Sequence, residues 1–73
     1  MQKKWSGSWD IAPCIVTTKR LSDSATVVAE TSDDARDSLL REALRREFGI
    51  SAESTINFFK QFVRVSGIRR VLA

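Results

Sequence analysis

The sequence contains no histidine, one cysteine, one proline and three glycines. Without histidine, imidazole metal sites, Ser-His-Asp triads and Cys-His dyads are excluded. The single cysteine, Cys14, excludes an internal disulfide and a cysteine-based zinc site. Because Gly7, Gly49 and Gly67 are far apart, there is no glycine-rich phosphate loop. We therefore expect no catalytic residues, no metal, no cofactor, no small-molecule substrate and no enzymatic activity.

Long apolar runs are also missing. No stretch approaches the roughly 18 to 20 apolar residues that cross a bilayer. Residues 1–10 carry Lys3 and Lys4 without the apolar segment that follows such lysines in a signal peptide. With the lone cysteine, this predicts a cytoplasmic protein without a membrane partner. The 73 residues give room for one domain with a small core.

The charged residues are unevenly distributed around a net charge of +3. Residues 1–22 carry four bases and one acid, residues 23–53 carry eight acids and four arginines, and residues 54–73 carry four bases and no acid. Clustered positive charge is typical of proteins that bind nucleic acid or an acidic partner. A solvated surface without a partner is the other interpretation.

The first thirty residues predict an arm followed by a hairpin. Residues 1–10 contain Ser6-Gly7-Ser8 and resemble a flexible arm, which leaves residues 11–73 as a single domain. Residues 14–20 and 25–30 are rich in β-branched residues and predict two strands joined by a turn at 21–24. We expect the two tryptophans, Trp5 and Trp9, to cover the core rather than to stack on bases.

The middle of the chain predicts a helix over 33–47. Thr31 or Ser32 can cap its start, and Gly49 is suited to end it. The opposite charges of Asp37–Arg41 and Glu42–Arg46 lie four residues apart, as in helix ion pairs. A wide apolar stripe is formed by Leu39, Leu40, Ala43, Leu44 and Phe48.

A second amphipathic helix is predicted over 52–65. At about 100° per residue, the apolar side chains from Ile56 to Val65 fall in one half-turn and the polar ones in the other. Residues 68–73 predict a short closing strand or a tail. The expected fold is therefore α+β, with an N-terminal β-hairpin followed by two amphipathic helices and a short C-terminal strand or tail.

Two groups of residues are candidates for binding. Lys60 and Arg64 lie one turn apart on the polar face of the predicted second helix. With them, the candidate contacts to nucleic acid or to an acidic partner are Lys60, Arg64, Arg69, Arg70, Lys19 and Arg20. The aromatic stripe of Phe58, Phe59 and Phe62 exceeds what one short helix needs, so it predicts core or an interface with a partner or a second copy.

One stretch resembles a known family. Gly49-Ile50-Ser51, Ser54-Thr55-Ile56-Asn57, Phe59-Lys60-Gln61, Val63 and Gly67-Ile68 together resemble the second half of RelB/DinJ-type antitoxins. Those proteins belong to the ribbon-helix-helix class. The resemblance implies a homodimer in which paired strands from two chains enter the DNA major groove, and it implies a role in transcription regulation.

The layout allows a second interpretation. A hairpin with helices on one face resembles, in size and charge, the small inhibitors that phages and mobile elements encode, anti-CRISPR proteins among them. That resemblance implies binding to a host protein or nucleoprotein complex by surface complementarity. We therefore expect a small non-enzymatic binding protein, either a dimeric DNA-binding regulator of antitoxin type or a phage-type inhibitor.

Overall fold

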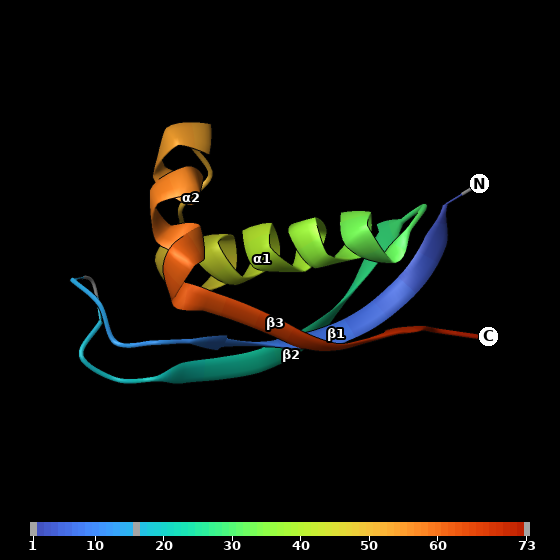
Figure 1. Ribbon diagram of the computed structural model, residues 1–73, viewed down its shortest axis with the longest axis horizontal. Helices are drawn as coiled ribbons and strands as arrows, with labels where there is room; N and C mark the ends of the chain where they lie inside the picture. The colour runs from blue at the N-terminus through green and yellow to red at the C-terminus, as the bar shows by residue number, and fades with distance from the viewer. Residues whose placement is uncertain (1, 16, 73) are drawn as a thin grey trace.

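A computed structural model describes residues 2–15 and 17–72 of the chain. The chain forms β1 (Lys3–Ile11), β2 (Leu21–Ala29), α1 (Ser32–Phe48), α2 (Glu53–Phe59), a 3-10 turn (Lys60–Phe62) and β3 (Val63–Arg70). The strands make one antiparallel sheet in the order β2-β1-β3. Both helices lie on the same side of this sheet, with α1 along it and α2 standing away from it (Figure 1). The predicted α+β class, with its hairpin, helices and C-terminal strand, is confirmed.

The long helix forms where its sequence predicts it. The Thr31 hydroxyl accepts a hydrogen bond from the Asp34 N–H at 3.2 Å and so caps the start. Gly49, in the left-handed region at φ 69°, ends the helix. Leu39, Ala43 and Leu44 are fully buried. The predicted apolar stripe therefore packs α1 both onto the sheet and against α2.

The predicted flexible arm over residues 1–10 is wrong, because Lys3–Ile11 form the central strand. Small side chains here serve close packing rather than flexibility. A Cβ atom on Gly7 would lie 2.6 Å from Leu39 Cδ1, so only glycine lets α1 approach β1 this closely. Trp9, with 2% of its surface exposed, is part of the core, as expected. Met1 lies outside the described residues.

The hairpin exists, but its strands differ from the predicted ones. The predicted strand over residues 14–20 belongs instead to the loop between β1 and β2. Cys14 and Thr17 form an isolated bridge in this loop. Val16 lies outside the described residues. The predicted turn at 21–24 is the start of β2 and pairs with β1 from Ile11 back to Ser8. Only the predicted strand over 25–30 agrees in part, because it covers most of β2. The β-branched pattern missed β1, which is the better partner because it buries Trp9 and Ile11.

The second helix is shorter than predicted. It ends at Phe59, and the chain becomes a strand from Val63, within the predicted helix range of 52–65. Val63 and Val65 pair with Ile11 and Trp9, so their β-branched side chains enter the core from the sheet. The predicted closing segment at 68–73 continues this strand to Arg70; Ala73 is outside the description.

The core has two neighbouring parts. One lies between α1 and the sheet and is built around Trp9, Ile11 and Leu39. The other lies under α2 and is built around Leu44, Ile56 and Phe59. Leu40, Phe48 and Val63 pack against both parts. Among the described residues, no helix is long and apolar enough to cross a membrane.

Candidate nucleic-acid interface

One face of the sheet has no helix over it in the described structure (Figure 1). Successive side chains of a strand point to opposite faces, and Gly7, Trp9 and Ile11 face α1. The strand register then assigns the other residues to the uncovered side. We call this surface the open face. It consists of Lys4, Ser6, Ser8, Asp10, Ser22, Ser24, Thr26, Val28, Arg64, Ser66 and Arg69.

The charges on the open face are mostly positive and mostly unpaired. Within the described residues, the three bases Lys4, Arg64 and Arg69 are exposed and take part in no ion pair. The one carboxylate, Asp10, is 2.5 Å from Nη1 of Arg20 and accepts a hydrogen bond from the Ser22 hydroxyl at 3.2 Å. The negative charge of Asp10 is therefore balanced by Arg20 of the same chain. The three bases Lys4, Arg64 and Arg69 stay available for a ligand.

A bulge in β3 brings two of these bases to the same face. Arg64 and Arg69 are five residues apart, so a regular strand would place them on opposite sides. The register instead shifts, since Ser8 lies opposite Ser66 while Ser6 lies opposite Arg69. The extra residue is absorbed at Gly67, whose φ of 65° suits a glycine bulge. The predicted pair Lys60 and Arg64 is replaced by the pair Arg64 and Arg69.

Hydroxyl groups are the functional feature that the sequence interpretation missed. Ser6 and Ser8 lie side by side with Thr26 and Ser24 across the β1–β2 ladder. Ser66 continues the row on β3. The signal was present in the sequence as hydroxyl residues at every second position, at 6 and 8 and at 22, 24 and 26. The sequence pattern assigns positions 6 and 8 to an arm and positions 22 and 24 to a turn, and only Thr26 falls in a predicted strand, so the shared face was not recognised.

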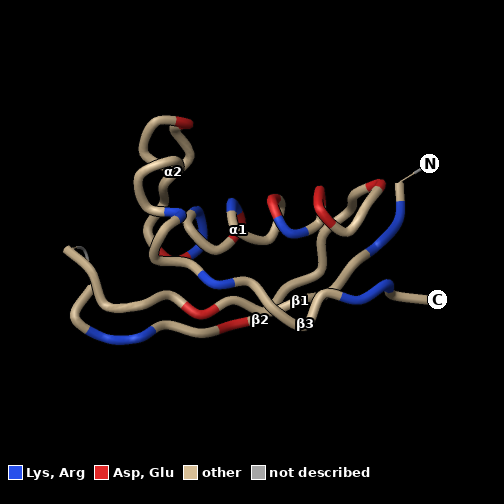
Figure 2. Tube along the Cα trace, in the orientation of Figure 1, with Lys and Arg blue, Asp and Glu red and all other residues tan. Residues whose placement is uncertain are grey.

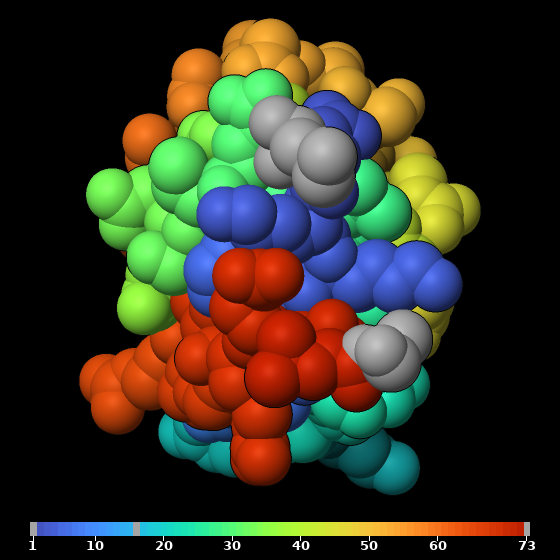
Figure 3. Space-filling model, turned by 90° about the vertical axis from the view of Figure 1, so that its right-hand side faces the viewer, coloured from blue at the N-terminus to red at the C-terminus, as the bar shows by residue number. Residues whose placement is uncertain are grey.

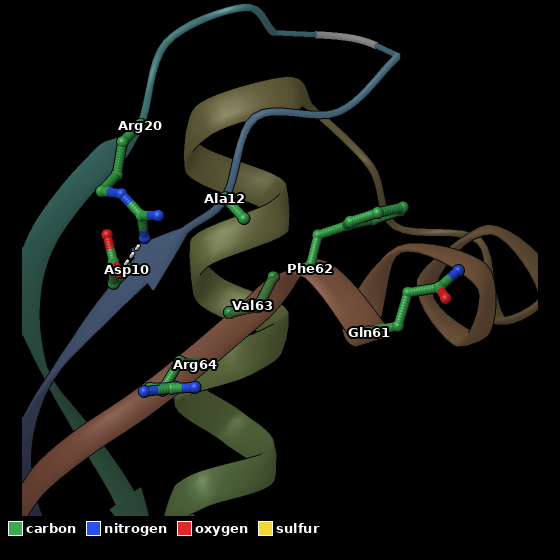
Figure 4. A pocket seen from close by; sticks show the side chains of 7 residues that line it. All are labelled: Asp10, Ala12, Arg20, Gln61, Phe62, Val63 and Arg64. Atoms are coloured by element: carbon green, nitrogen blue, oxygen red, sulfur yellow. Dashed lines mark hydrogen bonds and ion pairs between the residues drawn. The ribbon is translucent and has the colours of Figure 1, made fainter.

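The open face is not flat. Near its β1–β2 loop end, a hollow of about 290 Å³ is bordered by Asp10, Arg20 and Arg64 from three different segments. Figure 4 shows Arg20 and Asp10 joined by their ion pair, with Arg64 on the neighbouring strand β3. Arg20 was a predicted candidate and lies on this side of the sheet. Two guanidinium groups therefore flank one carboxylate at this end.

The acidic residues of the chain are concentrated in the helical layer. Figure 2 shows the red segments mainly along α1 and α2, above the sheet. There they pair with arginines: both predicted pairs form, Asp37–Arg41 at 2.8 Å and Glu42–Arg46 at 2.9 Å. Hydrogen bonds from Arg45, and also from Arg46, hold the pKa of Glu42 below its usual value. Six of the eight acids of the acidic middle therefore belong to the helices, which lie on the side away from the open face.

The remaining predicted basic residues lie elsewhere. Lys60 is in the 3-10 turn that directly follows α2, so it belongs to the helical layer rather than to the sheet. Arg70 lies opposite Trp5, with its guanidinium carbon 5.8 Å from the centre of a Trp5 ring. Lys19 is in the β1–β2 loop. Of the six predicted bases, Arg20, Arg64 and Arg69 therefore share the open-face side.

A second basic region lies where β1 begins and β3 ends. Figure 3 looks at this end and shows the blue and red segments against each other. The Val71 N–H donates to the Lys4 carbonyl at 2.9 Å, and Trp5 pairs with Arg70. Lys3 and Lys4 are thus close to Arg69 and Arg70. The two basic ends of the sequence therefore meet in space, with Lys4 and Arg69 on the open face and Lys3 and Arg70 on the opposite side of the sheet.

The predicted aromatic stripe is divided between core and surface. Phe59 is buried, with 7% of its surface exposed, and belongs to the core under α2. Phe62 is half-buried against the same core. Phe58 is 50% exposed and makes an edge-to-face contact with Phe59 at 5.0 Å. Of the three candidates for a partner interface, Phe58 has the most surface left for a partner.

No protein-family model, curated protein or solved structure matches this chain. Within the described residues, no group of three or more Cys, Asp or Glu side chains is arranged to hold a metal ion. The side chains of the open face are therefore the guide to what it binds. Neutral hydroxyl donors among unpaired guanidinium and ammonium groups suit a ligand with repeated negative charges.

Proposed function

We propose that this protein is a non-enzymatic nucleic-acid-binding protein that contacts the phosphate backbone through its open face. The observation that carries the proposal is the combination of hydroxyl rows on three strands with the unpaired bases Lys4, Arg64 and Arg69. Serine, threonine, lysine and arginine side chains are among the groups that contact backbone phosphates in protein–DNA complexes. The helical layer, which carries most of the acids, faces away and does not repel the ligand.

The composition of the open face favours nucleic acid over a protein partner. Protein interfaces depend on buried aromatic and arginine anchors at their centre. Among the described residues of the open face none is aromatic, and Val28 is its one large apolar side chain. Without aromatic side chains the face cannot stack on unpaired bases. We therefore expect binding to duplexes by shape and charge, with little dependence on base sequence.

The arrangement differs from the one that the antitoxin resemblance implies. In the ribbon-helix-helix class, the strand before the first helix pairs with its copy in a second chain. Here that strand, β2, pairs along its whole length with β1, and a further strand follows the second helix. The core around Trp9 and Leu39 is buried within one chain. Binding through the open face needs no second copy, and a dimeric regulator would have to use the outer edge of β2.

The test is duplex binding followed by fluorescence anisotropy over a range of salt concentrations. Three phosphates neutralised by Lys4, Arg64 and Arg69 predict a slope of log affinity against log salt of about −2.7, at roughly −0.9 per phosphate. Arg64→Gln should weaken binding and reduce the slope by about 1. Lys60→Gln removes the same charge on the helical side and is the matched control. Equal effects of the two variants, or no duplex binding, would refute the proposal.

A second candidate function rests on the exposed half of Phe58. This ring, with Phe62 beside it at 6.1 Å, forms an apolar projection where α2 stands away from the sheet. Such a projection suits insertion into a groove of a partner protein, as an inhibitor of a host protein or nucleoprotein complex would do. Phe58→Ala should then abolish inhibition of that target and leave duplex binding unchanged. Retained inhibition by this variant would eliminate the second candidate.

A further inference from the structure

A second hollow, of about 320 Å³, lies on the open face beside the bulge of β3. Its walls come from all three strands, with Ser6 and Ser8 on β1, Ser24 on β2 and Arg69 on β3. Gly7 and Gly67 complete the lining. The hollow therefore combines three hydroxyl groups, one guanidinium group and two residues without side chains.

The bulge forms the hollow in two ways. By inserting one extra residue between Ser66 and Arg69, it turns Arg69 to the same side as the serines of β1. It also places Gly67 so that a Cβ atom there would lie 3.7 Å from the Ser8 hydroxyl oxygen, in the hollow itself. A glycine at this position thus allows the backbone conformation and leaves the space open.

The groups lining the hollow have little to bind within the chain. The Ser8 hydroxyl lies 3.4 Å from the Ser66 carbonyl oxygen, which is a long hydrogen bond. In the described part of the structure, the hydroxyls of Ser6 and Ser24 and the guanidinium of Arg69 have no hydrogen-bond or ion-pair partner. The hydroxyls of Ser6 and Ser24 and the guanidinium of Arg69 are therefore available to a ligand, and the Ser8 hydroxyl becomes available by exchanging its long bond to Ser66.

This hollow differs from the two others on the same face. Asp10 lines both the hollow bordered by Arg20 and Arg64 and the hollow between that one and the bulge. Among the described residues that line the hollow at the bulge, none is acidic. The hollow at the bulge therefore offers hydroxyl and guanidinium donors and no carboxylate. Such donors bind an oxyanion, whereas a cation would need negatively charged acceptors.

We infer that the hollow at the Gly67 bulge is the anchoring site for one backbone phosphate. The guanidinium of Arg69 contacts the phosphate oxygens as a charged donor, and the hydroxyls of Ser6, Ser8 and Ser24 surround it as neutral donors. This inference rests on the proposed nucleic-acid binding, and it identifies the residues that hold one phosphate of the bound duplex. The remaining bases, Lys4 and Arg64, then lie on either side of the anchored phosphate and bind its neighbours along the backbone.

The hollow is tested first without nucleic acid, by NMR titration with inorganic phosphate at constant ionic strength. Saturable shifts are expected at the backbone amides of Ser6, Ser8, Gly67 and Arg69. Arg69→Gln should weaken phosphate binding at least tenfold, since a hydrogen bond to a charged group is lost. Arg70→Gln removes the same charge from the adjacent residue, whose side chain lies over Trp5, and should retain wild-type affinity. Ser8→Ala, which keeps every charge, should weaken binding several-fold.

Phosphate shifts elsewhere, or equal losses in the Arg69 and Arg70 variants, would overturn the hollow as the anchoring site. The same pair of variants is then compared in duplex binding. If the duplex binds but both variants lose affinity equally, the hollow is wrong and the proposed function stands. If phosphate shifts the hollow amides but no duplex binds, the proposed function is wrong and the hollow is an oxyanion site of another kind.

Discussion

Substituting alanine for Gly7 tests how the sheet and α1 are held together. Gly7 is in the middle of the central strand, and its φ is not positive. In that conformation alanine is ordinarily the better residue, by about 0.5–1 kcal/mol, because glycine loses more freedom on folding. Without a packing conflict, Gly7→Ala would therefore stabilise the protein.

The structure predicts the opposite sign. The new methyl group would lie 2.6 Å from Leu39 Cδ1, well inside van der Waals contact. Leu39 is fully buried, so it has no free space to turn into. Overpacking of this kind costs about 1–3 kcal/mol. Subtracting the gain of about 0.5–1 kcal/mol from replacing glycine leaves a net loss of up to about 2.5 kcal/mol, centred near 1 kcal/mol. Each kcal/mol lowers Tm by about 4–8 °C in a domain of this size.

The assay is urea unfolding followed by tryptophan fluorescence, to which the buried Trp9 and the half-buried Trp5 both contribute. A total stability of about 4–11 kcal/mol, expected for this length, leaves the variant folded. Leu39→Val removes the clashing methyl group, so the double variant should lose less than the sum of the two single losses. Ser6→Ala, on the neighbouring residue of the open face, is the control and should change stability by less than about 0.5 kcal/mol. A Gly7→Ala variant as stable as wild type, or more stable, would refute this packing.

Three other predictions concern stability. Gly67→Ala should destabilise by about 1–2 kcal/mol in urea unfolding, because alanine resists the positive φ of the bulge; an unchanged midpoint would argue against it. The Arg41 guanidinium donates hydrogen bonds to both carboxylate oxygens of Glu53 and so joins α1 to α2. Arg41→Ala should therefore speed backbone hydrogen exchange in α2 and leave exchange in β1 unchanged. The pKa of Glu42 is lowered by Arg45 and Arg46, so its stabilising effect is present above its ordinary value of 4.5 and is lost as the pH falls below it. Thermal unfolding between pH 7 and pH 3 should therefore show a smaller acid loss in Glu42→Gln than in wild type.

The parts of the fold that the sequence predicted are those set by local contacts. The helix α1 follows from its cap at Thr31, its stop at Gly49 and its apolar stripe, all of which act within a few residues. The β1 strand could not be recognised in this way. Its Ser6-Gly7-Ser8 segment has the composition of a linker. Its place in the sheet depends on long-range contacts, such as the packing of Leu39, 32 positions away in the chain, over Gly7.

In the candidate site too, the features set by nearby residues could be predicted from the sequence and those set by long-range contacts could not. The sequence predicts Arg64 and Arg69 as candidate binding residues because their segment has no acid, but their shared face depends on the bulge at Gly67, which the sequence pattern does not reveal. The serines of β1 and β2 could be recognised only after the two segments were known to be neighbouring strands. The exposed Phe58 and the buried Phe59 were indistinguishable in the sequence because both fit the same apolar half-turn.

The most direct test of the central claim is to map a bound duplex on the protein by NMR chemical shifts. A short duplex is titrated into the labelled protein at low salt. Binding through the open face predicts that the largest shifts fall on β1 and β3, at Lys4, Ser6, Ser8, Arg64 and Arg69, while α2 is unaffected. Shifts concentrated on α1 or α2, or no shifts at all, would contradict the proposed function.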